Sequence, residues 1–285
     1  MDRNCKWHKL NHLFEPLDAP RQSESTSGWG ALYSERHASL DMVETVYIEN
    51  QRRRTQSHKE HLSSCAQNIK GILLDLAKSG KIKHLHITDC WLGALDEFTP
   101  YSDYHGIGKT FIEPISQLKS LESLSVRYSE AVAKKGDYPL AKVNISKLAA
   151  SCPQLRELYF GAGYYPTMDE GAPSLATLRK LTLNGAPNAM LSIVDPAEVT
   201  RVVSNCPKLE ELHLIGLVCI TGKIFAPTEP PLKRLTTLNL DQSDKVRDED
   251  IQDLMGRMQS LRLVTFPNGK ALSKDHRIIE VEENG

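Results

Sequence analysis

The hydrophobic residues of this chain recur in one short phrase, apolar-x-x-apolar-x-apolar, which appears eight times. The copies, each given by its three apolar positions, are Val43-Val46-Ile48, Ile82-Leu85-Ile87, Leu121-Leu124-Val126, Leu155-Leu158-Phe160, Leu178-Leu181-Leu183, Leu209-Leu212-Leu214, Leu235-Leu238-Leu240 and Leu261-Val264-Phe266. Successive copies begin 39, 39, 34, 23, 31, 26 and 26 residues apart. The alternation at the end of each phrase predicts a short strand with one buried face and one exposed face.

Four of the segments between these strands carry a second pattern, with apolar residues at i, i+3, i+4 and i+7 or close to it, which is one face of an α-helix. The helical positions begin at residues 111, 145, 199 and 251, in each case ten residues before the next phrase. We expect the second of these helices to span residues 143–152, and a further helix to span 62–76. Residues 161–177 and 216–234 are rich in Gly and Pro, and this predicts loops.

An apolar phrase repeated every few tens of residues is typical of a leucine-rich-repeat solenoid. We therefore predict an α/β fold, a right-handed solenoid (horseshoe) of about eight irregular repeats, with a parallel concave sheet and outer helices or loops. We assign the solenoid to residues 41–270, a capping helix and a flexible segment to 1–40, and a C-terminal cap or tail to 271–285. The capping helix is predicted from the spacing of Trp7, Leu10, Leu13, Phe14 and Leu17.

Composition narrows the class of partner and the compartment. The formal net charge is -1, so no global field favours nucleic acid or an anionic membrane. No uncharged run approaches the roughly 18 residues that span a bilayer, and no signal-peptide core follows Met1. The six cysteines form no CxxC pair, which favours a reducing compartment. We predict a cytoplasmic or nuclear chain that binds neither nucleic acid nor membrane.

The residues between the apolar positions of each phrase are predicted to line the concave sheet, because strand side chains alternate. This face is polar and mixed in charge. The side chains on it that we predict to bind a partner are Tyr47, Glu49, His84, His86, Arg127, Glu157, Tyr159, Lys180, Asn184, Glu211, His213, Asn239 and Asp241.

Two clusters contain residue types that bind metals. His84 and His86 project from the same side of one strand, with Cys90 nearby, but no further ligands are evident in the sequence. Cys5, His8 and His12 fall within the predicted capping helix, and we favour the cap over a metal site there. We predict no metal site and no cofactor.

The segment Gly106–Thr110 (GIGKT) resembles the end of a phosphate-binding loop. The complete motif needs a glycine where the chain has Asp103, so we favour a glycine turn that opens a helix. A short basic run, 52–54, is interpreted as a solvated loop rather than a localisation signal. No catalytic motif was found, and we predict that the chain is not an enzyme; a nucleotide- or anion-binding enzyme that uses Gly106–Thr110 is the alternative.

Two stretches are specific enough to suggest a family. They are Cys152-Pro153-Gln154-Leu155-Arg156-Glu157-Leu158 and Cys206-Pro207-Lys208-Leu209-Glu210-Glu211-Leu212. A Cys-Pro-x-Leu-x-x-Leu motif after a helix resembles the cysteine-containing leucine-rich repeat of F-box proteins, and the irregular spacing resembles their fungal members, with a ribonuclease-inhibitor-like fold.

The resemblance implies a chain that captures the substrate of a ubiquitin ligase. Residues 1–40 contain no Leu-Pro-x-Glu start and are too short for an ordinary three-helix F-box. The F-box is then lost, or missing from a truncated sequence, or the protein is a free-standing adaptor. We predict a protein–protein interaction module whose partner binds the concave face or the loops 161–177 and 216–234; a purely structural scaffold is a further alternative.

Overall fold

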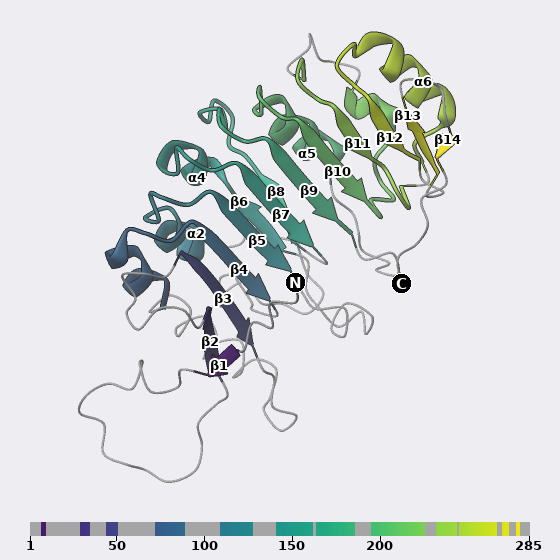
Figure 1. Cartoon of the computed structure of the whole chain (residues 1–285). Helices are drawn as coiled ribbons and strands as arrows, with labels where there is room; N and C mark the ends of the chain where they lie inside the picture. The colour runs from purple at the N-terminus through teal and green to yellow at the C-terminus, as the bar shows by residue number, and fades with distance from the viewer. Residues whose placement is uncertain are drawn as a thin grey trace, which may run out of the picture.

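The computed structural model describes residues 7–9, 29–34, 44–50, 72–88, 109–127, 141–161, 164–185, 195–225, 232–243, 245–266, 270–273 and 278–279. Within these ranges the chain is a mixed α/β protein with one large, mostly parallel sheet. Figure 1 shows the strands of this sheet side by side and in chain order.

Each apolar phrase forms one strand of the 12-stranded sheet. The eight strands are β3 (Thr45–Asn50), β4 (His84–Thr88), β5 (Ser123–Arg127), β7 (Glu157–Gly161), β9 (Lys180–Asn184), β10 (Glu211–Ile215), β11 (Thr237–Asn239) and β12 (Leu263–Thr265). Each pairs in parallel with the next in this order. The prediction that the phrases are strands is therefore confirmed.

The strands also share one register. The middle apolar residue of every phrase lies opposite the middle residue of its neighbours, and these residues are Val46, Leu85, Leu124, Leu158, Leu181, Leu212, Leu238 and Val264. All eight are at most 1% exposed. They form a continuous row of apolar side chains through the hydrophobic core, which we call the apolar ladder. A slip of one residue would turn the apolar side chains of a strand toward solvent, so their burial fixes the register.

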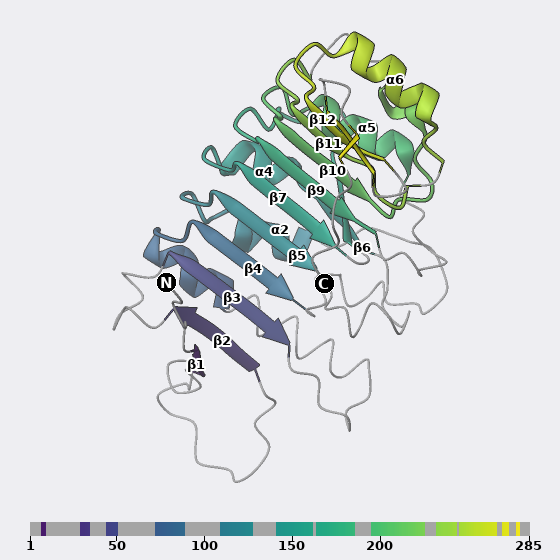
Figure 2. The same cartoon turned by 45° about the vertical axis from the view of Figure 1, so that its right-hand side comes forward.

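Helices pack against one side of the sheet, as Figure 2 shows. Residues 72–79 are helical, followed along the chain by α2 (Lys109–Ile115), α4 (Ser146–Ser151), α5 (Pro196–Ser204) and α6 (Asp248–Arg257), and a short 3-10 helix, η3 (Gly222–Phe225). Asp195 caps α5 by accepting the N–H of Ala197 at 2.9 Å. Val202 of α5 and Leu254 of α6 are buried in the same core as the strand leucines.

A common turn leads into six of the strands. The N–H of the first phrase residue donates to a carbonyl three residues earlier, for example from Leu155 to Cys152 and from Leu209 to Cys206. The carbonyl residues of these turns are all buried, and they are Leu118, Cys152, Leu175, Cys206, Leu232 and Met258. The two Gly- and Pro-rich segments thus end in the same turn as the helical ones.

Part of the predicted loop 161–177 is a strand, which corrects the prediction. Strand β8 (Tyr164–Thr167) pairs in parallel with β6 (Ala141–Asn144) in a second, two-stranded sheet. The helix predicted over 143–152 accordingly begins only at Ser146. Pro166 fits in β8 because a strand with one neighbour has a free edge that needs no N–H donor.

The two ends of the large sheet are antiparallel. Strand β2 (Trp29–Ser34) lies between β1 (Trp7–Lys9) and β3, and at the other end β13 (Ala271–Ser273) and β14 (Ile278–Ile279) follow β12. Residues 7–9 are therefore extended, and the capping helix predicted to begin at Trp7 does not begin there. The remaining positions of that predicted helix lie outside the described residues.

Candidate binding surface

On the side of the sheet away from the helices, the common register places residues in three rows, and we call this side the open face. The first row consists of Thr45, His84, Ser123, Glu157, Lys180, Glu211, Thr237 and Leu263. The second consists of Tyr47, His86, Ser125, Tyr159, Thr182, His213, Asn239 and Thr265. The third consists of Glu49, Thr88, Arg127, Gly161, Asn184 and Ile215. The face predicted to be concave thus comprises neighbouring strands in one register.

A charged cluster occupies β9 and β10. The Nζ atom of Lys180 lies 2.9 Å from Oε2 of Glu211, and Nε2 of His213 lies 3.4 Å from the same oxygen. The hydrogen bond from Lys180 lowers the pKa of Glu211. Burial lowers the pKa of His213, so its ring is neutral at pH 7 and the contact with Glu211 is a hydrogen bond rather than an ion pair.

Tyr159 is held in place by its neighbours. The Nδ2 atom of Asn184 donates to the Tyr159 hydroxyl at 3.2 Å. Gly161 supplies the space for the ring, since a Cβ at that position would lie 2.8 Å from Cε1 of Tyr159 and 3.2 Å from Cβ of Arg127. The hydroxyl can still donate its own hydrogen to a partner, because it uses only an acceptor lone pair here.

His86 lies between charged neighbours on β4, β5 and β7. Burial is the largest cause that lowers its pKa, followed by His84 and Arg127, while Glu157 acts in the opposite direction. The ring is therefore neutral at pH 7. Among the described residues, no group of three or more His, Cys, Asp or Glu side chains could hold a metal ion.

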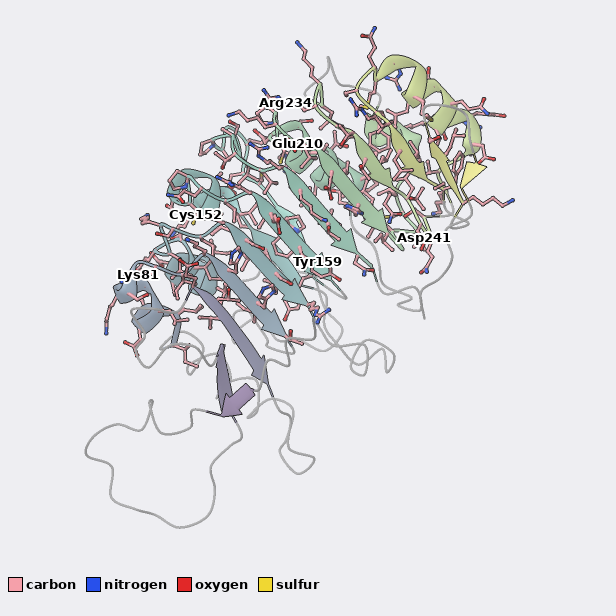
Figure 3. The ribbon with its side chains drawn as sticks, in the orientation of Figure 1. Lys81, Cys152, Tyr159, Glu210, Arg234 and Asp241 are labelled. Carbon is pink, nitrogen blue, oxygen red and sulfur yellow. The ribbon has the colours of Figure 1, made fainter. Side chains whose placement is uncertain are left out.

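Two predicted binding residues also have a structural task. The Oδ1 atom of Asn239 accepts the N–H of Asp241 at 2.9 Å, and the carbonyl of Asp241 accepts the N–H of Gly216. Asp241 lies in the turn after β11, beyond the strand alternation from which it was predicted. Figure 3 shows Asp241 and Tyr159 toward the edge where the strands end.

Several sequence candidates cannot be placed. Tyr47 and Glu49 occupy backbone positions in β3, but their side chains are outside what the structure describes. Cys5, Cys90, residues 52–54 and residues 106–108 lie entirely outside the described residues. Of the Gly106–Thr110 segment only the last two residues are described, as the start of α2.

A charged edge beside the open face was missed by the sequence reasoning. The positions before and between the apolar residues of each phrase contain many Lys and Arg residues, and because the phrases share one register these residues lie along a single edge. The signal was present in the sequence at fixed offsets from the leucines.

Comparisons with known proteins add little to this description. No family model matches the chain, and no curated protein matches it. One similar solved structure is titled the crystal structure of the Rad7 and Elc1 complex in yeast, with a TM-score of 0.33 and 14% identity. The match covers 76% of this chain and 61% of that chain, so this chain spans less than two thirds of that protein's length.

Among the described residues, no helix is long and apolar enough to cross a membrane.

Proposed function

We propose that the chain is a leucine-rich-repeat solenoid whose open face binds another protein, without catalysis and without a cofactor. The observation that supports this most strongly is the common register of the eight phrase strands, with buried leucines on one side and polar rows on the other. Stacked repeats of this kind offer an extended surface with side chains at fixed spacing, and repeat proteins bind their partners on such surfaces.

The chemistry of the open face suits a protein partner with mixed charges. Arg127 and Glu157 are exposed and unpaired among the described residues, whereas Lys180 and Glu211 neutralise each other. Arg and Tyr side chains are enriched where proteins contact one another, and both types are present on β5 and β7. A surface with both signs of charge and neutral histidines matches a folded protein better than a polyanion.

We further propose that the partner is the substrate of a ubiquitin ligase. This step rests on the resemblance to F-box leucine-rich-repeat proteins, which the two Cys-Pro motifs carry. In support, Cys152 and Cys206 are buried at the turn before a strand, where the Sγ of Cys206 donates to the carbonyl of Val202 at 3.1 Å. Proteasome inhibition should raise the level of the bound partner if the chain delivers it for degradation.

A reducing compartment, the cytoplasm or the nucleus, fits the same residues. Cys152 and Cys206 form no disulfide in the part of the chain that the structure describes. Disulfides are rare in reducing compartments, so free thiols are expected there.

A paired charge swap tests binding by the open face. Affinity purification identifies the partner, and its affinity is then measured for the wild type and for Lys180→Glu combined with Glu211→Lys. The swap keeps the internal ion pair and removes the contact between Glu211 and His213, so we expect a melting temperature close to that of the wild type. Because it reverses the charges that the partner meets, binding should be at least tenfold weaker.

The matched control is Glu113→Lys combined with Lys147→Glu on the helical side, where the wild-type pair is 3.5 Å apart. This control should bind the partner as the wild type does. Equal affinity of both swapped variants would refute binding by the central part of the open face.

The alternative, an enzyme that uses Gly106–Thr110, has a separate test. We expect isothermal titration with millimolar ATP and GTP to give no binding heat. Saturable heat that Lys109→Ala abolishes would favour the nucleotide-binding alternative over the interaction module.

A further inference from the structure

The edge of the sheet where the parallel strands begin carries a row of charged residues. Backbone hydrogen bonds connect one residue of each phrase to the next phrase. The carbonyl of that residue accepts the N–H groups of two successive residues in the next phrase. The residues joined in this way are Glu44, Lys83, Glu122, Arg156, Arg179, Glu210, Thr236 and Arg262. Their order along the edge is therefore fixed by the backbone.

The turns just before the same strands add basic residues to this row. These turn residues are Lys81, Lys119, Lys208, Lys233 and Arg234, and all five are exposed. Figure 3 shows Lys81, Glu210 and Arg234 along the edge where the strands begin. We call the two sets together the basic edge; it contains nine basic and three acidic side chains, a net charge of +6, in a chain whose net charge is -1.

Most of these cations have no anionic partner among the residues that the structure describes. Lys83 pairs with Glu44 at 2.8 Å, and Arg179 pairs with Glu210 at 3.0 Å. Within the described residues, the other seven basic side chains form no ion pair, and they are Lys81, Lys119, Arg156, Lys208, Lys233, Arg234 and Arg262. Like charges brought side by side in this way repel one another, so a bound anionic partner would stabilise the edge.

We infer that the basic edge is a second docking surface, which binds an acidic, extended segment of a partner protein. From Lys83 to Arg262 the row crosses six strand-to-strand steps, and at about 4.8 Å per step this is about 29 Å. An extended peptide rises by about 3.3 Å per residue, so about nine residues cover the row. Arg156 and Arg262, which form no ion pair among the described residues, offer guanidinium groups that bind carboxylates in a bidentate manner.

A protein segment fits this edge better than a nucleic acid. Glu122 and Glu210 lie within the row and would repel a continuous phosphate backbone. The described residues of the row include no aromatic side chain on which a base could stack. A peptide with carboxylates at intervals can place uncharged residues opposite these two glutamates.

This surface is separate from the open face, and the two can be tested independently. The test variant is Arg156→Gln, Lys208→Gln and Arg262→Gln together, at exposed positions without ion pairs. The control removes three exposed lysines elsewhere, Lys147→Gln, Lys223→Gln and Lys245→Gln, of which Lys147 lies 3.5 Å from the exposed Glu113. Fluorescence anisotropy measures binding of a labelled nine-residue glutamate-rich peptide, its glutamine counterpart and a nine-nucleotide oligothymidylate.

We expect the acidic peptide to bind the wild type and the control about equally, and the edge variant about tenfold more weakly or worse. Binding should also weaken several-fold between 50 and 200 mM NaCl, because exposed charges are screened. Absence of binding at low salt, or equal binding by the edge variant, would overturn the inference. Tighter binding of the oligothymidylate, lost in the edge variant, would assign the edge to a nucleic acid instead. The charge swap of Lys180 and Glu211 should leave peptide binding unchanged. Loss of binding at the basic edge can therefore be distinguished from loss of binding at the open face.

Discussion

Replacing Leu212 by Ala removes an interior member of the apolar ladder. Leu212 is 0% exposed and lies in register between Leu181 on β9 and Leu238 on β11. Its side chain therefore lies at the contact between three repeats.

The size of the effect follows from the buried carbon atoms that are lost. The substitution removes three carbons, and at about 0.8 kcal/mol each the transfer term is about 2.4 kcal/mol. The cavity left behind adds to this, because both neighbouring strands are fixed by backbone hydrogen bonds and cannot collapse into it; the total is about 3–5 kcal/mol. This is a large part of the 5–15 kcal/mol by which native proteins are typically stable.

Urea unfolding, followed by far-UV circular dichroism, measures this loss. Val218→Ala is the control, because Val218 is 40% exposed and its truncation should cost less than about 1 kcal/mol. If Leu212→Ala unfolds within 1 kcal/mol of the wild type, the apolar ladder does not hold the repeats together.

Three further substitutions probe other parts of the account. Gly161→Ala should displace Tyr159, destabilise the protein by about 1–3 kcal/mol and weaken partner binding; an unchanged affinity would show that the position of Tyr159 does not matter. Gly256→Ala, in α6 with nothing within 4 Å of the added Cβ, should raise stability by about 0.5–1 kcal/mol in the same urea titration, and a loss would contradict this. Burial raises the pKa of the Cys206 thiol from 9.0 to about 12 in the folded chain. Above pH 9 the unfolded chain therefore binds fewer protons than the folded chain, so the free energy of unfolding should fall as the pH rises toward 12. Melting curves at pH 8 and pH 10 should show a smaller fall for Cys206→Ala than for the wild type; an equal fall would contradict the argument.

The strands could be predicted from the sequence because each phrase carries its own burial pattern. Leu158 and Phe160 are buried while Tyr159 between them is not, as the alternation requires. The helix starts were predictable where a local signal exists, as at Asp195, which caps α5. The strands and the helix starts could be predicted because they depend on local sequence signals or on a pattern that recurs in every repeat.

The second sheet was missed because its signal was masked by loop-forming residues. Tyr164, Pro166 and Met168 alternate as buried positions, and this period of two indicates a strand, but the surrounding Gly and Pro residues favoured a loop. The pairing of Tyr164 with Ala141 is also a long-range contact that no local pattern encodes.

The basic edge illustrates a different limit. Each of its nine basic residues is an ordinary Lys or Arg in the sequence, and the chain as a whole is nearly neutral. Only the common register shows that Arg156, Arg179 and Arg262 lie along a single edge. Such a pattern of charges determines the chemical class of the partner but does not identify the partner.

Site-specific photo-crosslinking tests most directly whether the open face binds a protein. A photo-reactive amino acid is placed at Arg127 or Asn239 on the open face, and at Ser204 or Gln252 on α5 and α6 as controls. We predict that the purified partner crosslinks from the two open-face positions and not from the two helical ones, and that excess unlabelled chain competes. Crosslinking from the helical positions alone would contradict the claim that the open face is the binding surface.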